Sequence, residues 1–141
     1  MKADALTEQA ARACVNAFLT AYAERRMDAA MAQLAPDADV VLFGTGADEK
    51  RVGPAAVRAQ LDRDWTQSEA CAYAIDWSQV SSAGSVAWMA SDGAFRVRVG
   101  GQDMAMPARA TFVVEQRDGR WLVCHAHFSM PAAAQQDGES F

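Results

Sequence analysis

Apolar residues recur at helical spacing in the first half of the chain. Between residues 7 and 22 they come at intervals of four, three and four, which predicts an amphipathic helix capped by Thr7. A short second helix is predicted over residues 28–34, before Pro36. A third helix is predicted to open at Pro54, because proline suits the first helical position. The buried sides are expected to hold Ala11, Val15, Phe18 and Tyr22 in the first helix and Val57, Leu61 and Trp65 in the third.

The period of the pattern falls to two residues in the second half of the chain. A short strand over residues 38–43 precedes the third helix, and Gly93 is expected to mark a bulge in a later strand. Helices near the N-terminus followed by antiparallel strands are typical of an α+β fold. The alternation predicts strands over 71–77, 86–99, 104–116 and 120–129.

The turn at Asp118-Gly119 decides how the last two strands pair. A two-residue turn pairs Arg117 with Arg120, whereas a three-residue turn with a left-handed glycine places Arg109 opposite His127. We favour the three-residue turn, because it groups side chains of like polarity. The apolar face then holds Ala110, Phe112, Val114, Leu122, Cys124, Ala126 and Phe128. The mixed face holds Arg109, Thr111, Glu115, Trp121, Val123, His125, His127 and Ser129.

Composition narrows the class of protein. The chain has 141 residues, which predicts one domain over residues 1–131 and a flexible tail over residues 132–141. A net charge of −5 argues against nucleic acid as a partner. No apolar run is long enough to span a membrane and no signal peptide is visible, so we expect a cytoplasmic protein. Three widely spaced cysteines predict neither a disulfide framework nor a zinc site.

Three features together resemble a known superfamily. They are the order of helices and strands, the loop FGTGADEKRVG before the third helix, and the ending RDGRWLVCHAHFSMP. The chain resembles the nuclear transport factor 2-like superfamily in its SnoaL-like and ketosteroid-isomerase-like branch. The ending is also similar to the association domain of calcium/calmodulin-dependent kinase II. The resemblance implies a cone in which three N-terminal helices pack on a curved, mostly antiparallel sheet around a pocket, and it implies a homodimer.

The resemblance also implies the character of the pocket. Phe112 and Phe128 occupy positions where the kinase association domain carries arginines, while Trp65 matches a tryptophan that lines its pocket. An acidic ligand of that type is therefore disfavoured, because its charge would be buried without a partner. We expect a small apolar or aromatic ligand and no cofactor. The predicted ligand-binding residues are Trp65, Trp88, Phe112, Phe128 and Phe43.

Enzymes of this superfamily need a base and a hydrogen-bond donor in a dry pocket. Tyr22 lies on the apolar side of the first helix, and Asp92 shares strand parity with Trp88, so these two are the catalytic candidates. The favoured interpretation of Tyr22 is a core tyrosine whose hydroxyl is satisfied. Asp92 fits equally a solvated acid beside Gly93 at the mouth of the cone. Glu49, in the loop that is expected to cover the pocket entrance, is a further polar candidate.

The alternating histidines near the C-terminus suggest a second surface. Two histidines without a carboxylate partner are a weak zinc signal, so we predict no metal site. The predicted interface or alternative site consists of Arg109, Thr111, His125, His127 and Ser129. A bulge near the end of the strand would instead turn His127 into the pocket.

Two functions follow from these patterns. The first is a small-molecule-binding domain with an apolar aromatic pocket, acting as an isomerase or cyclase by proton transfer on a ketone-like substrate. The alternative is a non-catalytic dimerisation module whose pocket its own aromatic side chains fill. An open pocket with an acid or a tyrosine inside favours the first function.

Overall fold

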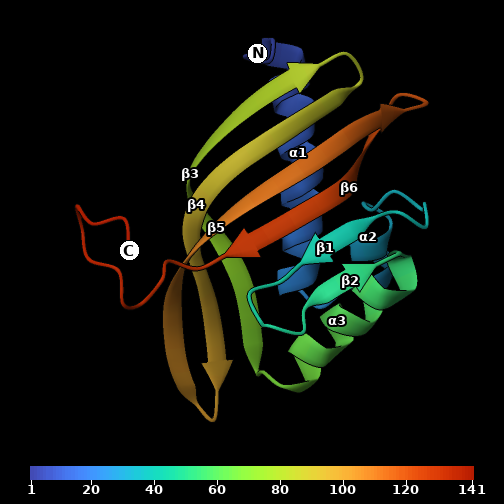
Figure 1. Cartoon of the computed structure of the whole chain (residues 1–141). Helices are drawn as coiled ribbons and strands as arrows, with labels where there is room; N and C mark the ends of the chain where they lie inside the picture. The colour runs from blue at the N-terminus through green and yellow to red at the C-terminus, as the bar shows by residue number, and fades with distance from the viewer.

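The computed structural model describes residues 1–141 and confirms the α+β fold. Three helices belong to the first half of the chain and four long strands to the second (Figure 1). The helices are α1 (Ala5–Ala23), α2 (Met27–Met31) and α3 (Pro54–Thr66). The strands are β1 (Val41–Phe43), β2 (Lys50–Val52), β3 (Ala70–Ala83), β4 (Val86–Val99), β5 (Gln102–Arg117) and β6 (Arg120–Ser129).

One curved sheet contains all six strands. Its order is β2-β1-β6-β5-β4-β3, and every neighbouring pair is antiparallel except β1 and β6, which run parallel. Helix α1 lies along the concave face of the sheet, behind the strands in Figure 1, and α3 lies beside β1 and β2. None of the three helices has the length and the apolar character that a bilayer crossing requires.

The sequence predicted some of the helix ends correctly and others incorrectly. Helix α1 is capped by Asp4 and not by Thr7, because the Asp4 side chain accepts hydrogen bonds from the backbone N–H groups of Leu6 and Thr7, each at 3.0 Å. Helix α2 ends at Met31, three residues before the predicted end. Helix α3 begins at Pro54 as predicted.

The turn between β5 and β6 contains two residues and not the predicted three. Asp118 and Gly119 both have positive φ angles, of 49° and 77°, as a two-residue turn that matches the sheet twist requires. Arg117 therefore pairs with Arg120. A β-bulge then restores most of the predicted grouping, because Val113 pairs with His125 and Val114 with Val123, leaving Cys124 as the extra residue.

The bulge at Cys124 reverses the alternation within β6. Before the bulge, Trp121 and Val123 point to the same side as Val114, and Leu122 faces the side of Glu115. This corrects the predicted faces for those three residues. Beyond the bulge, the grouping is as predicted, with Arg109 now opposite Ser129 and Thr111 opposite His127.

Gly93 has a bulge opposite it rather than within its own strand. Ile75 pairs with Gly93 and Trp77 with Asp92, so Asp76 is the extra residue, and it belongs to β3. A Cβ at position 93 would lie 1.9 Å from the Ala74 carbonyl oxygen, so the close approach of the two backbones requires glycine.

The hydrophobic core lies between α1 and the concave face of the sheet. Each of its main side chains is at most 3% exposed, and side chains of this size stabilise the fold by about 1.5–3 kcal/mol each when fully buried. The sheet supplies more of the core residues than α1 does; the main side chains are Val15 and Phe18 from the helix, and Met89, Phe112 and Val114 from the strands. The core leaves the region between α3 and the far ends of β3, β4 and β5 to form a cavity.

Candidate functional site: a cavity closed by two carboxylates

A cavity of about 380 Å³ opens between the C-terminal half of α1, helix α3 and the concave face of the sheet. Most of its wall is apolar, and its polar groups gather on the side of α3. The apolar wall includes Phe18, Leu19, Leu42, Leu61, Cys71, Tyr73, Phe95, Val97, Met106 and Phe128. The polar groups come from Tyr22, Thr45, Glu49, Gln60, Asp64, Gln67 and Ser68.

Three aromatic rings form the sheet side of the cavity. The ring centroids of Tyr73, Phe95 and Phe128 lie 5.3–5.5 Å apart in tilted and edge-to-face geometries. Phe112, which is fully buried, supports Phe128 edge-on from behind at 5.5 Å. Packing of this kind holds the rings in place, so the wall offers a flat ligand a preformed aromatic surface.

Asp64 is the acid of the cavity. Its Oδ2 accepts a hydrogen bond from the Tyr22 hydroxyl at 2.9 Å, and its Oδ1 accepts one from the Gln60 amide at 2.7 Å. No arginine or lysine pairs with it. Burial raises the pKa of Asp64 above its ordinary value, although the hydrogen bonds from Tyr22 and Gln60 oppose that rise.

Tyr22 stays protonated over the whole practical pH range. Burial raises its pKa strongly, and the neighbouring negative charge of Asp64 raises it further. The hydroxyl is therefore a hydrogen-bond donor to the carboxylate and does not act as a base itself.

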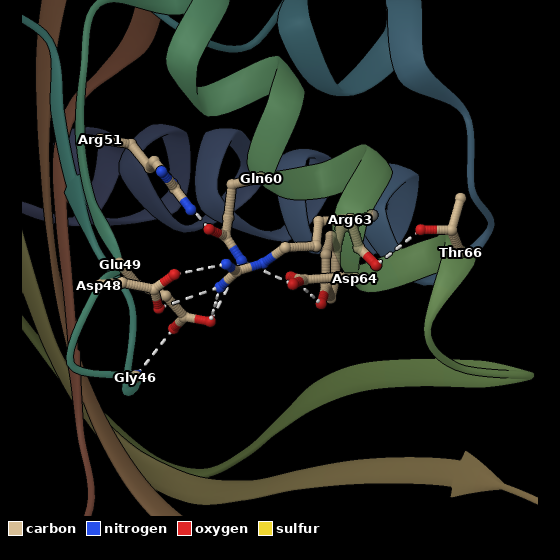
Figure 2. A network of polar contacts seen from close by, with 9 residues as sticks. Gly46, Asp48, Glu49, Arg51, Gln60, Arg63, Asp64 and Thr66 are labelled. Atoms are coloured by element: carbon tan, nitrogen blue, oxygen red, sulfur yellow. Dashed lines mark hydrogen bonds and ion pairs between the residues drawn. The ribbon is translucent and has the colours of Figure 1, made fainter.

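A second carboxylate is tied to the first through one buried amide (Figure 2). Gln60, only 4% exposed, donates from its Nε2 to Asp64 and also to Glu49 Oε1 at 3.2 Å, while its Oε1 accepts from Arg51 Nε at 2.8 Å. Glu49 further pairs with Arg63 at 2.8 Å. Glu49 is thus neutralised by an arginine, whereas Asp64 is not, so the two acids differ in reactivity.

Hydrogen bonds between α1 and the end of α3 hold the Tyr22 side of the cavity together; we call these the α1–α3 clasp. The Trp65 indole N–H donates to the Tyr22 carbonyl at 3.0 Å. Arg25 donates to the carbonyl oxygens of Trp65 at 2.7 Å and of Ser68 at 2.8 Å. Arg25 has a φ of 58°, a backbone conformation that usually takes glycine, and its side-chain hydrogen bonds offset that strain.

Two of the predicted catalytic and ligand-binding residues line the cavity. Tyr22 and Phe128 do so, together with Glu49 from the loop before β2. Phe112 lies one layer behind Phe128. Trp65 packs against Tyr22, with ring centroids 6.1 Å apart, on the side away from the ligand space.

Three predicted residues lie on the opposite face of the sheet. In β4 the buried positions are Ala87, Met89 and Ser91, so Trp88 and Asp92 point outward and not into the cavity as their parity predicted. The physical reason is the register of β4: Met89 and Ser91 are buried on the side of α1, so the residues of the other parity, Trp88 and Asp92, face away from it. Phe43 also points outward, where it packs on His125 and His127.

The sequence reasoning missed Asp64 and Gln60. Gln60 follows Val57 by three residues and Asp64 follows it by seven. Both are therefore polar residues on the buried side of α3, which Val57 and Leu61 define. Polar residues at the apolar positions of a helix were the available signal, because such residues are buried only where partners satisfy them.

The outer face of the sheet carries the predicted mixed group. Arg109, Thr111, His125, His127 and Ser129 line a hollow of about 310 Å³, which we call the outer hollow. No group of three or more His, Cys, Asp or Glu side chains comes close enough anywhere in the chain to hold a metal ion.

The fold and the cavity define the chain as a nuclear transport factor 2-like protein, as the closing motif predicted. Within that class, the chain belongs to the SnoaL-like domain family, whose sequence model matches residues 11–133. Comparison with curated protein sequences found no match.

Solved structures share the fold at low sequence identity. A candidate calcium/calmodulin-dependent protein kinase II association domain from Xanthomonas campestris is 25% identical, with a TM-score of 0.77 over 87% of this chain and 86% of that one. A candidate aromatic ring hydroxylase from Novosphingobium aromaticivorans is 16% identical, with a TM-score of 0.81 and 93% of each chain covered. A candidate scytalone dehydratase from the same organism is 12% identical, with a TM-score of 0.78 over 90% and 85%.

Proposed function

We propose that this SnoaL-like domain binds a small apolar or aromatic ketone-like molecule in its cavity and catalyses a proton transfer on it. The observation that carries the proposal is Asp64, an acid without an ion pair in a mainly apolar cavity and with a raised pKa. A base of this kind works best when its pKa approaches the operating pH. The similarity to a candidate dehydratase and a candidate ring hydroxylase supports a small cyclic ligand.

In the proposed reaction Asp64 and Tyr22 act in sequence. The ionised Asp64 removes a proton from the carbon next to the substrate carbonyl, and the C–H electron pair becomes the enolate. Once protonated, Asp64 attracts the Tyr22 hydroxyl less, so that the hydroxyl is free to donate to the enolate oxygen. In a substrate whose enolate is conjugated with a C=C bond, return of the proton from Asp64 to the far carbon of that bond completes an isomerisation. In a substrate with a second carbonyl, the enolate carbon forms a C–C bond to it, the C=O electron pair moves onto its oxygen, and that oxygen takes the proton from Asp64, which completes a cyclisation.

Gln60 and Glu49 serve as positioning residues in this proposal. The Gln60 amide fixes the Asp64 carboxylate through Oδ1 and the Tyr22 hydroxyl fixes it through Oδ2, and both Asp64 and Tyr22 line the cavity. Glu49 holds that amide from the other side and closes the network toward the loop.

The open cavity favours this function over the dimerisation module with a self-filled pocket. Phe112 stays in the core, and Phe128 forms part of the wall without occupying the ligand space. About 380 Å³ lies within the range of pockets that take small ligands.

The test is hydrogen–deuterium exchange at the α-carbon of a panel of mono- and bicyclic aromatic ketones, followed by NMR in D₂O. We expect catalysed exchange with at least one ketone, and a loss of about a hundredfold or more in Asp64→Asn. Asp62→Asn is the matched control, because Asp62 is an exposed acid on the same helix that does not line the cavity. Exchange that survives in Asp64→Asn, or that falls equally in both variants, would overturn the assignment of Asp64.

A further inference from the structure

The outer hollow brings together hydrogen-bond donors from adjacent strands. Arg109 lies directly opposite Ser129, and Thr111 directly opposite His127, so the four side chains form a square on the outer face of β5 and β6. His125 extends the square by one position along β6, on the same face. The β6 residues of the hollow belong to the strand half that pairs with β1, and Figure 1 shows these two strands side by side.

The polar groups of these five side chains have no hydrogen-bond or ion-pair partner among the neighbouring side chains. Arg109, Thr111, His125, His127 and Ser129 make no side-chain hydrogen bond, and Arg109 makes no ion pair. Asp92 is the cross-strand neighbour of Arg109, but the two side chains do not come within ion-pair distance. The other nearby acid of this face, Glu115, is already bound to Arg117 at 2.6 Å.

We propose that the outer hollow binds a phosphate group, either free or carried by a small molecule. One guanidinium, two hydroxyls and two imidazoles supply cationic and neutral donors, and no carboxylate is among the residues that line the hollow. Guanidinium groups bind phosphate with two parallel N–H donors, and hydroxyls satisfy its remaining oxygens. The net charge of −5 gives the protein no general attraction for anions, so binding here depends on these local donors.

The histidines supply a readout of binding. Burial and the neighbouring His127 lower the pKa of His125, while a hydrogen bond with the Val41 backbone opposes that shift. Phe43 packs on both imidazoles, with ring centroids 5.1 Å from His127 and 6.2 Å from His125, and it is paired with Lys50 of β2. A bound phosphate favours the protonated imidazole, so occupation of the hollow raises the pKa of His125.

The experiment is an NMR titration of the imidazole signals of His125 and His127 with inorganic phosphate between pH 5.5 and 8. Chloride at matched ionic strength serves as the reference. We expect saturable shifts with phosphate only, and an upward shift in the pKa of His125 at saturation. Arg109→Gln should weaken binding about tenfold or more, because it removes the one permanent cation of the hollow.

Arg96→Gln is the matched control variant. Arg96 is also an exposed arginine of the same sheet face, without an ion pair and outside the hollow, so its loss should leave phosphate binding unchanged. Equal weakening in both variants, or shifts that chloride reproduces, would overturn the proposal.

The oligomeric state is measured on the same samples by analytical ultracentrifugation. A dimer that Arg109→Gln dissociates, with no phosphate response from the histidines, would assign this face to a second copy of the chain and refute the phosphate site. A saturable phosphate response in the wild type that Arg109→Gln removes, with unchanged oligomeric state, supports the site.

Discussion

Replacement of Gln60 by leucine tests the polar network at the cavity. Leucine is close to glutamine in volume, so the change removes the amide without leaving a large void. It deletes three hydrogen bonds, to Asp64, Glu49 and Arg51, all of which are partly buried. The two carboxylates lose the donor that bridges them.

The expected cost follows from the charges involved. A hydrogen bond to a charged group contributes roughly 1.5–3 kcal/mol, but water can partly replace the amide at Glu49 and Arg51. We therefore expect the free energy of unfolding to fall by about 2–3 kcal/mol. With an unfolding entropy of about 2.1 cal/mol/K per residue, a chain of 141 residues should lose about 7–10 °C in Tm.

The assay is thermal and urea denaturation at pH 7, with Gln67→Leu as the control. Gln67 follows the same helix and lines the cavity, but it is exposed and its side chain makes no hydrogen bond, so its replacement should change the stability by less than about 0.5 kcal/mol. If Gln60→Leu loses less than about 1 kcal/mol, the amide does not hold the two acids as we argue. A second readout is the pKa of Asp64, which should rise in Gln60→Leu because the Gln60 hydrogen bond lowers it.

Three further substitutions test the fold and the site. Gly93→Ala should destabilise the protein by about 2 kcal/mol or more in urea unfolding, because its Cβ meets the Ala74 carbonyl; a stable variant would refute that close approach. Phe112→Ala should cost about 3–5 kcal/mol by the same assay, and a loss below 1 kcal/mol would contradict its place in the core. Asp64→Asn should be more stable than the wild type at pH 7, because the raised pKa of Asp64 means that ionisation destabilises the folded state. That advantage should shrink as the pH falls through the raised pKa and vanish below about 3.8, and a constant difference would refute it.

Much of the fold was predictable because it depends on local periodicity. The spacing of Val57 and Leu61 located α3, and the alternation from residue 86 to 99 located β4 with the correct ends. The turn at Asp118 was located correctly, but its length was predicted wrongly, because a bulge six residues away restores the grouping of side chains on which the choice rested. Nothing in the sequence around Cys124 distinguishes the two registers.

The site was less predictable, because it depends on which side of each strand meets a helix. Parity correctly grouped Trp88 with Asp92, but only the packing of α1 decides that this pair faces outward. The outer group around Arg109 was predictable, since polarity alone separated it from the core. Asp64 was hidden, because its partner Tyr22 is 42 residues distant and no local spacing relates the two.

The α1–α3 clasp has a consequence for the speed at which a ligand enters and leaves. Hydrogen bonds from Trp65 and Arg25, together with the Tyr22–Asp64 bond, connect α1 to α3, so separation of these helices would break several bonds at once. The opposite rim, residues 44–49, is a short loop held by Glu49 to the Gly46 N–H and to Arg63, and by Asp48 to Arg63. We therefore expect that loop to set the residence time of a ligand. Substitutions in the aromatic wall should then change the affinity, and substitutions of Glu49 should change the rate at which the ligand exchanges.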